Sequence, residues 1–376
     1  MKFHYGQDYY SVDDIDLSPF RLEKGDTKYL KSDNKEVFDF VGFVLNEDNL
    51  LCVFPKHFYT DLELKDLNRR KDANLEDIKL LFDVFVKYTK EVSTTAKAAK
   101  YIGAKPEFES DYPFAPFFEV YKHFRQYGIY RESNIEIKPN ANGPVAWRKT
   151  IQKAQTIVSE GNLIFSPLYR KKKKQENVFL SECMVFVIDH TISNFPYFIN
   201  LPKTGYKISS FNFIKHREYT LQQLRQISSK TFKDTQKRLI ANLINFFEQY
   251  NKSPKGGDIH IKINYFDKIW ERMVSTYLNK YFKSVDDVSN SIIFDNRLIS
   301  SPLNFETKEF AVDDSSHQFK IRLDHFAQKD DSIYIFDSKY YYDVSDLNYK
   351  QFSYNEMLRG GISKNTKIFS ALILPG

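Results

Sequence analysis

The sequence has little of several features that mark common protein classes. It contains 2 cysteines in 376 residues, too few for a disulfide framework or for a metal site with four cysteine ligands. No stretch approaches the roughly 18 uninterrupted apolar residues of a membrane span, and the N-terminus lacks the apolar core of a secretory signal. We therefore expect a cytoplasmic protein that does not cross a membrane, with Cys52 and Cys183 as small core residues.

Several sequence motifs are absent as well. There is no internal repeat, no nucleophile elbow of the serine hydrolases, and no set of histidines at the spacing of zinc ligands. The phosphate-binding pattern GxxxxGK[ST] is also missing. Any nucleotide-driven movement would therefore have to come from another chain.

The composition that remains is that of a folded protein, with 42% hydrophobic and 28% charged residues. Because one hydrophobic core rarely grows past about 250–300 residues, the length predicts two or three domains. The net charge is +6, and the segment from Gly161 to His260 holds 16 Lys or Arg against 7 Asp or Glu, a net of +9. Positive charge concentrated in this way suits nucleic acid, although a solvated Lys-rich surface explains a single run equally well.

The candidate DNA contacts lie in and just before this basic segment. Trp147 and Arg148 stand at the start of a predicted helix, where a tryptophan more often packs than stacks on a base. The charge run that follows fits a DNA contact or an exposed loop, and consists of Arg170, Lys171, Lys172, Lys173 and Lys174.

Hydrophobic periodicity predicts mixed α and β structure. Two apolar runs between Val37 and Phe58 form a hairpin around Asn46–Asn49. The other segments are predicted as helices over Leu75–Val92 (with Ile78, Leu81, Phe82 and Phe85 on one face), Pro116–Tyr127 (ended by Gly128) and Thr220–Tyr250, and as a strand over Val178–Ile192.

The pattern breaks at Asn251–Gly257, which is rich in Pro, Gly and Lys. We expect three regions. Residues 1–155 form an α+β region that binds DNA or a partner, 156–255 a basic region with a strand and a long helix, and 256–376 the catalytic domain.

The C-terminal region begins with a predicted helix over Asn264–Phe282. Its buried face is expected to hold Phe266, Ile269, Trp270, Met273, Tyr277 and Tyr281. Glu271 stands beside this face, where a carboxylate costs free energy unless it has a cation, a metal or hydrogen-bond donors.

Two predicted strands follow, Phe319–Phe326 and Ile333–Tyr340. A four-residue or two-residue loop pairs Gln328 with Ile333, which places Asp324 opposite Asp337. Opposed Cβ atoms lie about 5 Å apart and next-but-one residues about 6.5–7 Å apart, so Lys339 reaches the same volume. A three-residue loop would destroy this parity.

Two carboxylates at that distance repel each other unless a divalent cation lies between them. Mg²⁺ suits them because it takes hard oxygen ligands and keeps waters that attack phosphates. Lys339 would orient or deprotonate the water, or stabilise charge in the transition state. The chemistry indicated is hydrolysis of a phosphodiester.

An acidic residue two positions before a lysine is common in this chain, since it occurs seven times. The context distinguishes Asp337: it follows an apolar strand and precedes a predicted helix (345–359) and strand (367–374). A surface hairpin in which Lys339 merely pairs with the aspartates remains the alternative.

The residues of these two strands resemble the active site of the PD-(D/E)XK nuclease superfamily. Arg322-Leu323-Asp324 with Asp337-Ser338-Lys339 resembles its active-site motif, most closely that of LlaJI-type restriction endonucleases and of McrC nuclease subunits. Weaker similarity extends to Val41–Val44, to Phe54-Pro55-Lys56-His57 and to Ala146–Ile151. The resemblance implies a C-terminal core of α-β-β-β-α-β order with a mixed sheet, preceded by a mixed α+β region.

Carried over by position, the resemblance makes Asp324 and Asp337 metal ligands, Lys339 the catalytic lysine and Glu271 a helix-borne carboxylate that also reaches the metal. The helix after the active site would support or contact the DNA backbone through Lys350, Gln351 and Tyr354. The resemblance further implies double-stranded DNA as substrate, Mg²⁺ as cofactor and, for McrC-like subunits, a GTP-hydrolysing AAA+ motor as partner.

Two features depart from the family pattern. Leu323 replaces the proline that usually precedes the first aspartate, and the chain ends at Gly376 directly after the last predicted strand. The chain thus ends at a point where the family pattern would allow a further C-terminal portion.

The main hypothesis is a Mg²⁺-dependent DNA endonuclease of a restriction or McrBC-like defence system. The alternative from another class is a non-catalytic adaptor that binds nucleic acid or a partner through the basic segment. An RNA- or nucleotide-directed hydrolase on the same fold is a third reading. Mg²⁺-dependent plasmid cleavage distinguishes the first from the second.

Overall fold

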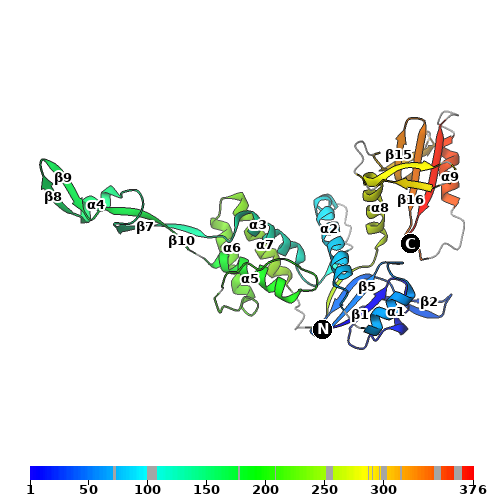
Figure 1. Cartoon of the computed structure of the whole chain (residues 1–376), viewed down its shortest axis with the longest axis horizontal. Coiled ribbons are helices and arrows are strands. Elements are labelled where there is room, and N and C mark those ends of the chain that lie inside the picture. The colour runs from blue at the N-terminus through cyan, green and yellow to red at the C-terminus, as the bar shows by residue number, and fades with distance from the viewer. Residues whose placement is uncertain are drawn as a thin grey trace. The chain divides into compact units, whose positions relative to one another are not determined.

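A computed structural model gives the fold. It describes residues 1–70, 73–99, 108–176, 178–207, 209–250, 257–286, 288–289, 291–295, 297, 303–313, 316–342, 349–359 and 366–376. The chain forms two compact units, Met1–Ser110 with Lys252–Gly376, and Asp111–Asn251 (Figure 1). Within the described ranges, none of the helices has both the length and the hydropathy needed to cross a membrane.

The first unit contains a five-stranded sheet of order β1-β5-β4-β11-β6. Its strands are β1 (Lys2–Gln7), β4 (Val41–Leu45), β5 (Asn49–Phe54), β6 (Phe108–Ser110) and β11 (Ile259–Ile263). Strands β1 and β5 are parallel, whereas the other pairs are antiparallel. The pairing of Leu45 with Leu50 confirms the hairpin predicted between Val37 and Phe58.

We call this five-stranded sheet the N-terminal sheet. Smaller elements surround it. They are η1 (Val12–Asp14), the hairpin of β2 (Thr27–Leu30) and β3 (Lys35–Phe38), α1 (Asp61–Arg70) and α2 (Leu75–Ala99). The apolar face predicted for α2 is confirmed, because its four members are buried. One of them, Phe85, meets Phe43 of β4 edge-on with ring centroids 6.0 Å apart.

A glycine allows β11 to join the N-terminal sheet. Gly42 of β4 has φ 149°, and a Cβ built on it would lie 2.2 Å from the Ile261 carbonyl oxygen. Only glycine tolerates both this conformation and this approach. Strand β11 is therefore held inside the N-terminal sheet, and three residues later the chain enters α8 (Asp267–Tyr281).

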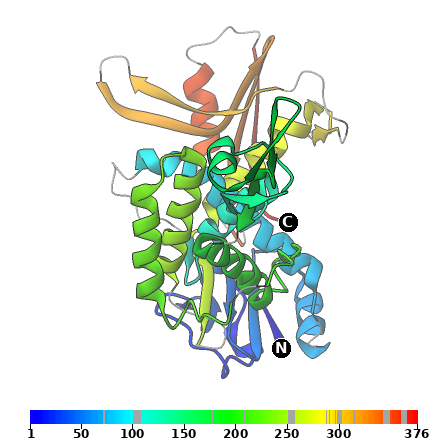
Figure 2. The same cartoon turned by 90° about the vertical axis from the view of Figure 1, so that its left-hand side faces the viewer.

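A second, four-stranded sheet of order β14-β15-β16-β17 lies in the same unit (Figure 2). Its strands are β14 (Glu306–Asp313), β15 (Ser316–Lys329), β16 (Ser332–Ser338) and β17 (Lys367–Ile373). Strands β14, β15 and β16 are antiparallel neighbours, and β17 runs parallel to β16 after the helix α9 (Tyr349–Arg359). A hairpin of β12 (Phe282–Asp286) and β13 (Ser291–Phe294) follows α8.

Helices α8 and α9 cover opposite faces of this sheet. Val274 and Leu278 of α8 pack in one cluster with Ala327 and Phe336. Tyr354 and Leu358 of α9 pack against a second cluster, made of Leu323, Phe326, Ile333 and Ile335. The predicted helix, two strands, helix and strand occur in that order as α8, β15, β16, α9 and β17, but β12, β13 and β14, which the periodicity did not identify, lie between α8 and β15. The assignment to the PD-(D/E)XK fold stays a prediction.

The buried face of α8 differs from the predicted one. Ile269, Val274 and Leu278 are buried, but Met273 and Tyr277 are 42% and 46% exposed. The prediction grouped all large apolar residues on one side. The sheet instead covers a narrower stripe of the helix, which leaves Met273 and Tyr277 outside it.

The second unit contains a helical part. Its helices are α3 (Phe114–Tyr127), α5 (Phe179–Asn194), α6 (Arg217–Lys230) and α7 (Asp234–Gln249). The strand predicted over Val178–Ile192 is wrong, because this segment is helical. Cys183, Met184, Val187 and Ile188 are all buried, and a helix buried on most sides shows the same continuous apolar run as a strand.

Two other helices were predicted with partial success. Gly128 caps the C-terminus of α3, with its N–H bonded to the Phe124 carbonyl, as expected. The single helix predicted over Thr220–Tyr250 is two helices, because residues 231–233 leave the helical conformation between α6 and α7.

A two-stranded arm extends from the helical part (Figure 1). Strands β7 (Glu132–Pro139) and β10 (Tyr169–Glu176) pair antiparallel, and between them lie α4 (Trp147–Lys153) and the hairpin of β8 (Gln155–Ser159) and β9 (Asn162–Ser166). Thr150 of α4, which is fully buried, fixes α4 on β10 because its Oγ1 accepts the Tyr169 N–H at 3.0 Å.

The mixed α and β architecture is thus confirmed. The division into functional regions at residues 155 and 255 stays a prediction, and the break at 251–256 lies outside the described residues. In the structure, residues 1–110 belong to the same compact unit as the C-terminal sheet.

Candidate active site

Three predicted site residues meet at the end of the β15–β16 hairpin. Gln328 pairs with Ile333 and His325 with Phe336, so the predicted register is confirmed, with Asp330-Asp331 as the turn. The Lys339 ammonium lies 2.7 Å from Oδ1 of Asp337 and 3.4 Å from Oδ2 of Asp324. The pairing of Lys339 with both aspartates is what the surface-hairpin alternative expected, but Asp337, at 3% exposed, does not lie on the surface.

A β-bulge lies beside Asp324. The pairing of β14 with β15 shifts by one residue between Lys308–Leu323 and Glu306–Phe326. Leu323 and Phe326 accordingly contribute to one apolar cluster, although strict alternation would put them on opposite faces. Bulges of this kind re-aim side chains next to active sites, and the alternation predicted from Phe319 to Asp324 ends here.

The two aspartates have opposite electrostatic environments. Burial, together with the hydrogen bond and charge of Asp324, raises the pKa of Asp337 to about 6. Burial also acts to raise the pKa of Asp324, but the hydrogen bond with Asp337 and the Lys339 ammonium outweigh it and leave the pKa lowered. Below pH 6 the pair thus shares a proton, and above it two carboxylates face each other.

The lysine stays charged in this arrangement. Burial lowers the pKa of Lys339, but its contacts with Asp337 and Asp324 outweigh this and raise the pKa above 10.5. A third contact, to the Ser338 carbonyl at 3.1 Å, uses another of its N–H donors. Lys339 is therefore a positive charge and a donor here, which favours the roles of orienting water or stabilising charge over that of a base.

The donor set fits a hard divalent cation. The second oxygen of Asp337, Oδ2, is buried and accepts no hydrogen bond from an N–H or hydroxyl group of the described residues. Only the proton shared with Asp324 can satisfy it, and the pair loses that proton above about pH 6. A buried carboxylate oxygen without a donor is costly unless a cation satisfies it. Carboxylate oxygens of Asp337 and Asp324 are the ligands that Mg²⁺ prefers.

Glu271 approaches the same site from α8. Its carboxylate is paired with Arg322 at 3.2 Å and is one-third exposed. Burial raises its pKa, and the charge of Asp324 raises it further, which places the two carboxylates within electrostatic reach. The sequence analysis identified Glu271 and placed Arg322 in the motif, but it did not predict that the two side chains pair.

His325, the residue after Asp324, lies on the other side of the strand. It is 1% exposed and its Nε2 is hydrogen-bonded to the hydroxyl of Ser338, the middle residue of the Asp-Ser-Lys motif. Burial lowers its pKa to about 4, so it is neutral at physiological pH. His325 thus supports β16 next to the site.

The residues predicted on the following helix are only partly placed. Tyr354 of α9 is half-buried, and burial and the charge of Asp337 raise its pKa, which puts its hydroxyl near the site. The backbones of Lys350 and Gln351 belong to α9, but their side chains lie outside the described residues. Their DNA contacts stay predictions.

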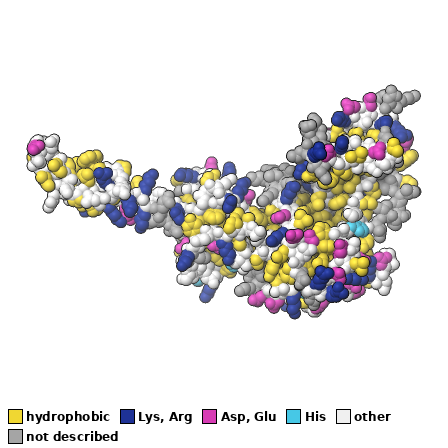
Figure 3. Space-filling view, in the orientation of Figure 1, with side chains coloured by type: hydrophobic (Ala, Val, Ile, Leu, Met, Phe, Trp, Pro, Cys, Tyr) yellow, Lys and Arg dark blue, Asp and Glu magenta, His cyan; other side chains and the backbone are white. Residues whose placement is uncertain are grey.

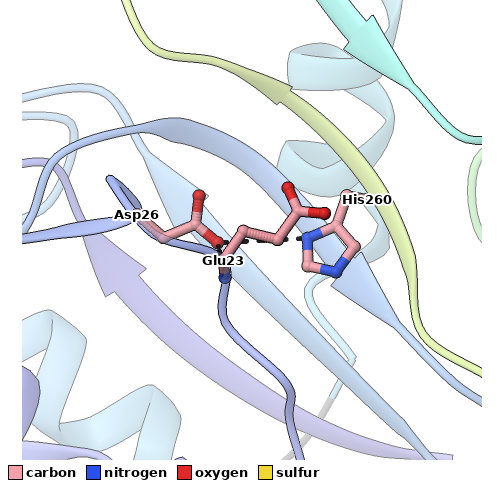
Figure 4. Close-up of side chains that lie close together, drawn as sticks. All are labelled: Glu23, Asp26 and His260. Carbon is pink, nitrogen blue, oxygen red and sulfur yellow. Dashed lines mark hydrogen bonds and ion pairs between the residues drawn. The ribbon is translucent and has the colours of Figure 1, made fainter.

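A second acidic cluster, in the N-terminal sheet, was missed by sequence reasoning. Glu23 and Asp26 precede β2 and meet His260 of β11, with ligand atoms within 4.8 Å of one another (Figure 4). The buried Lys262 ammonium, however, lies 2.6 Å from Asp26 and 2.5 Å from Glu23. A lysine already neutralises these carboxylates, so the cluster is an ion-pair network that fixes β11.

The other candidate DNA-binding residues lie on the arm. Lys171, Lys172, Lys173 and Lys174 are exposed on β10, and the Arg170 guanidinium donates to the Gly143 carbonyl. Trp147 is 57% exposed, although its ring meets that of Phe165 edge-on with centroids 6.4 Å apart, so it packs only in part. Figure 3 shows Lys and Arg side chains along the part of the arm nearest the helices.

Of the comparisons with known proteins, the family model agrees with the sequence motifs. The LlaJI restriction endonuclease family model matches residues 40–373. The curated proteins contain no match. One similar solved structure is a refined half-complex from a tetradecameric assembly of Thermococcus gammatolerans McrB AAA+ hexamers with bound McrC. Its matched chain is 11% identical, with a TM-score of 0.35 over 99% of this chain and 94% of that chain. Because the family model spans most of the sequence, the chain belongs to the LlaJI restriction endonuclease family.

Proposed function

We propose that the protein is a Mg²⁺-dependent DNA endonuclease of a restriction system, with a C-terminal PD-(D/E)XK core. One observation carries the proposal: a buried carboxylate oxygen of Asp337 without a donor stands beside Asp324 and a lysine held between the two. Membership of a restriction endonuclease family supports DNA as the substrate.

The residues have distinct roles in this proposal. Asp337 and Asp324 would hold Mg²⁺, and Glu271 would reach it directly or through water. When bound, Mg²⁺ would supply Lewis acidity at the scissile phosphate and make a water molecule there easier to deprotonate. Lys339 keeps its proton and donates hydrogen bonds toward the oxygens on which charge develops. Arg322 holds the Glu271 carboxylate.

The cleavage experiment has two arms. Purified protein is incubated with plasmid and with unmodified or methylated linear DNA, with Mg²⁺ or with EDTA. We expect strand cleavage with Mg²⁺ and none with EDTA. The second arm adds an AAA+ GTPase from the same genome with GTP, because we propose that an McrB-like motor of this kind assists the nuclease. DNA binding without cleavage in both arms would instead support the adaptor function.

We further propose that the arm binds the DNA backbone. Four consecutive lysines on β10 are exposed, and their side chains alternate between the two faces of the β7–β10 pair. In this arrangement they can reach successive phosphates. The ion pairs of Glu136 with Lys138 at 2.7 Å and with Lys174 at 3.8 Å offset part of this charge. Trp147 and Arg148, exposed at the start of α4, add an aromatic surface and a fifth cation.

Replacing Lys171–Lys174 by glutamine is expected to weaken DNA binding and its salt dependence. Each lost phosphate contact reduces the slope of log K against log salt by about 0.9, so the loss of all four should reduce it by about 3.6. Fluorescence anisotropy over a range of salt concentrations measures it. The matched control replaces the exposed Lys230, Lys233 and Lys237 of the helical part. An unchanged slope in the arm variant would place the DNA elsewhere.

A further inference from the structure

Two β-turns lie at one edge of the N-terminal sheet. Strands β1 and β5 are parallel neighbours, so their C-terminal ends meet at the same edge. The first turn is Gln7–Tyr10, closed by the Tyr10 N–H on the Gln7 carbonyl at 2.8 Å. The second is Pro55–Phe58, closed by the Phe58 N–H on the Pro55 carbonyl at 3.2 Å. The second turn contains the Pro55-Lys56-His57 motif, to which the proposed chemistry assigns no role.

Both turns contain a non-glycine residue in the left-handed region of φ. The values are 71° for Tyr9 and 59° for His57. Residues with side chains rarely adopt this conformation, and it persists where surrounding contacts hold it. Two such residues side by side at one sheet edge therefore point to contacts that both side chains must make.

Those contacts go to the segment directly after Lys339. The His57 Nε2–H donates to the Tyr342 carbonyl at 2.6 Å, and the His57 ring stacks on the Tyr342 ring with centroids 4.7 Å apart. The Tyr9 ring stacks on the same Tyr342 ring at 6.2 Å. Both left-handed residues thus hold Tyr342.

Lys56 holds Tyr340, the residue next to Lys339. Its backbone N–H donates to the Tyr340 hydroxyl at 2.8 Å, and its ammonium donates to the Tyr340 carbonyl at 3.2 Å. The ammonium also lies 4.3 Å from the centroids of both the Tyr340 and the Tyr9 rings. Tyr340 is 9% exposed, so these contacts are made in the interior.

A buried carboxylate completes the network. Asp8, which is 7% exposed, lies 3.6 Å from the Lys56 ammonium and is hydrogen-bonded to the Tyr340 side chain. Its pKa is raised to about 6 by burial, against the effect of Lys56. A buried ion pair contributes little net stability, but it defines one geometry because only that geometry satisfies every charge.

The N-terminal sheet therefore holds the site from two directions. Strand β11, fixed by Lys262, leads directly into α8 and its Glu271. The Lys56 and His57 contacts hold the chain that follows Lys339. Phe266, at the start of α8, meets the Tyr340 ring at 5.4 Å and joins the two routes.

We propose that Lys56 and His57 are positioning residues for the catalytic lysine. They fix the backbone of Tyr340–Tyr342 and thereby set where the Lys339 ammonium stands relative to Asp324 and Asp337. The inference rests on the proposed function for its effect on catalysis, but the contacts themselves can be tested without it.

The test uses Lys56→Met and His57→Asn in the full chain. Methionine keeps the apolar stem of Lys56, and asparagine tolerates the left-handed φ while removing the imidazole. We expect kcat for cleavage to fall about 10- to 100-fold, as displacements of about 1 Å near a reacting group do. The dissociation constant for DNA should stay within about twofold, because neither residue lies among the proposed DNA contacts.

A second readout does not depend on activity. Chemical acetylation of Lys339, followed by mass spectrometry, should accelerate several-fold in both variants, as should amide hydrogen exchange in the peptide 338–342. The matched control is Lys28→Met, because Lys28 also lies over the Tyr9 ring, at 3.9 Å, but pairs with Asp39. It should leave kcat, acetylation and exchange unchanged.

The outcomes separate the two proposals. If wild-type protein does not cleave DNA but the variants expose Lys339, the nuclease proposal fails and the positioning contacts stand. If wild-type protein cleaves DNA and both variants keep its kcat and its Lys339 acetylation rate, the positioning role is overturned. Equal effects of Lys28→Met and Lys56→Met on kcat, acetylation and exchange would also overturn the positioning role. The change would then come from a general loosening of the N-terminal sheet and not from the loss of the Lys56 contacts.

Discussion

The Asp337→Asn variant is expected to lose cleavage by about 1,000-fold while its DNA binding is retained. Asn keeps the size of the side chain but removes the charge that faces Asp324 and the oxygen available to Mg²⁺. Cleavage is measured under single-turnover conditions with enzyme in excess. The matched control is Asp330→Asn, the same change in the exposed turn of the same hairpin, which should cleave at the wild-type rate.

Lys339→Met in the same experiment separates metal binding from catalysis. Removing the ammonium leaves both carboxylates in place, so Mg²⁺ should bind at least as tightly by calorimetry, whereas Asp337→Asn should bind it more weakly. Cleavage by Lys339→Met should still fall about 100- to 1,000-fold, because a charge aimed at the transition state is lost. Cleavage near the wild-type rate in either variant would contradict the site assignment.

The convergence of this site could be predicted because it depends on strand parity. Side chains alternate with period two, and any even-numbered loop between Gln328 and Ile333 gives the same pairing. The polar tract Lys329–Ser332 was short enough to specify such a loop. Two aspartates and a lysine could therefore be placed together before any long-range contact was known.

Other parts of the fold depend on contacts that leave no local pattern. The helix α5 is apolar almost throughout because α3 and α7 cover it, and its sequence resembles a buried strand. The break between α6 and α7 contains no Pro or Gly, only Thr231-Phe232-Lys233. The two helices pack on each other, and this packing determines where the chain turns.

The residues that surround the site were the hardest to predict. Lys56 and Tyr340 are 284 positions apart, and a single sequence gives no signal for a pairing at that distance. The left-handed φ of Tyr9 was equally hidden, because tyrosine is not typical of that conformation. Histidine is enriched there, but that preference alone did not single out His57 among the histidines of the chain. Tertiary contacts, rather than local preference, decide both features.

The Lys262→Met variant is expected to lose about 3–5 kcal/mol of stability, the usual cost of breaking a buried ion pair by removing one partner. Asp26 is 1% exposed, and without the ammonium its carboxylate keeps the Glu23 N–H at 2.7 Å as a donor. A loss of this size lowers the melting temperature of a unit of about 200 residues by roughly 10 °C. Differential scanning calorimetry measures it and separates the transitions of the two units.

The double variant Lys262→Met with Asp26→Asn tests the cause. Asn still accepts from the Glu23 N–H but carries no charge, so the double variant should be more stable than Lys262→Met alone. Lys35→Met is the matched control, since Lys35 pairs with Asp33 at 3.4 Å on the surface and should change stability by less than about 0.5 kcal/mol. A double variant no more stable than the single one would show that shape, not charge, is what Lys262 supplies.

The pH dependence of this loss follows from the direction of the shift. Burial lowers the pKa of Lys262, but Asp26 and Glu23 outweigh it and raise the pKa above 10.5. A group whose folded-state pKa is raised contributes fully below its unfolded pKa and loses that contribution only as the pH rises through the folded value. The difference in free energy of unfolding between wild type and Lys262→Met should therefore be the same at pH 7 and pH 9, and should shrink only above about pH 10.5.

Because β11 leads into α8, the same variant should also loosen the position of Glu271. Its cleavage rate should therefore fall at temperatures where the protein is still folded.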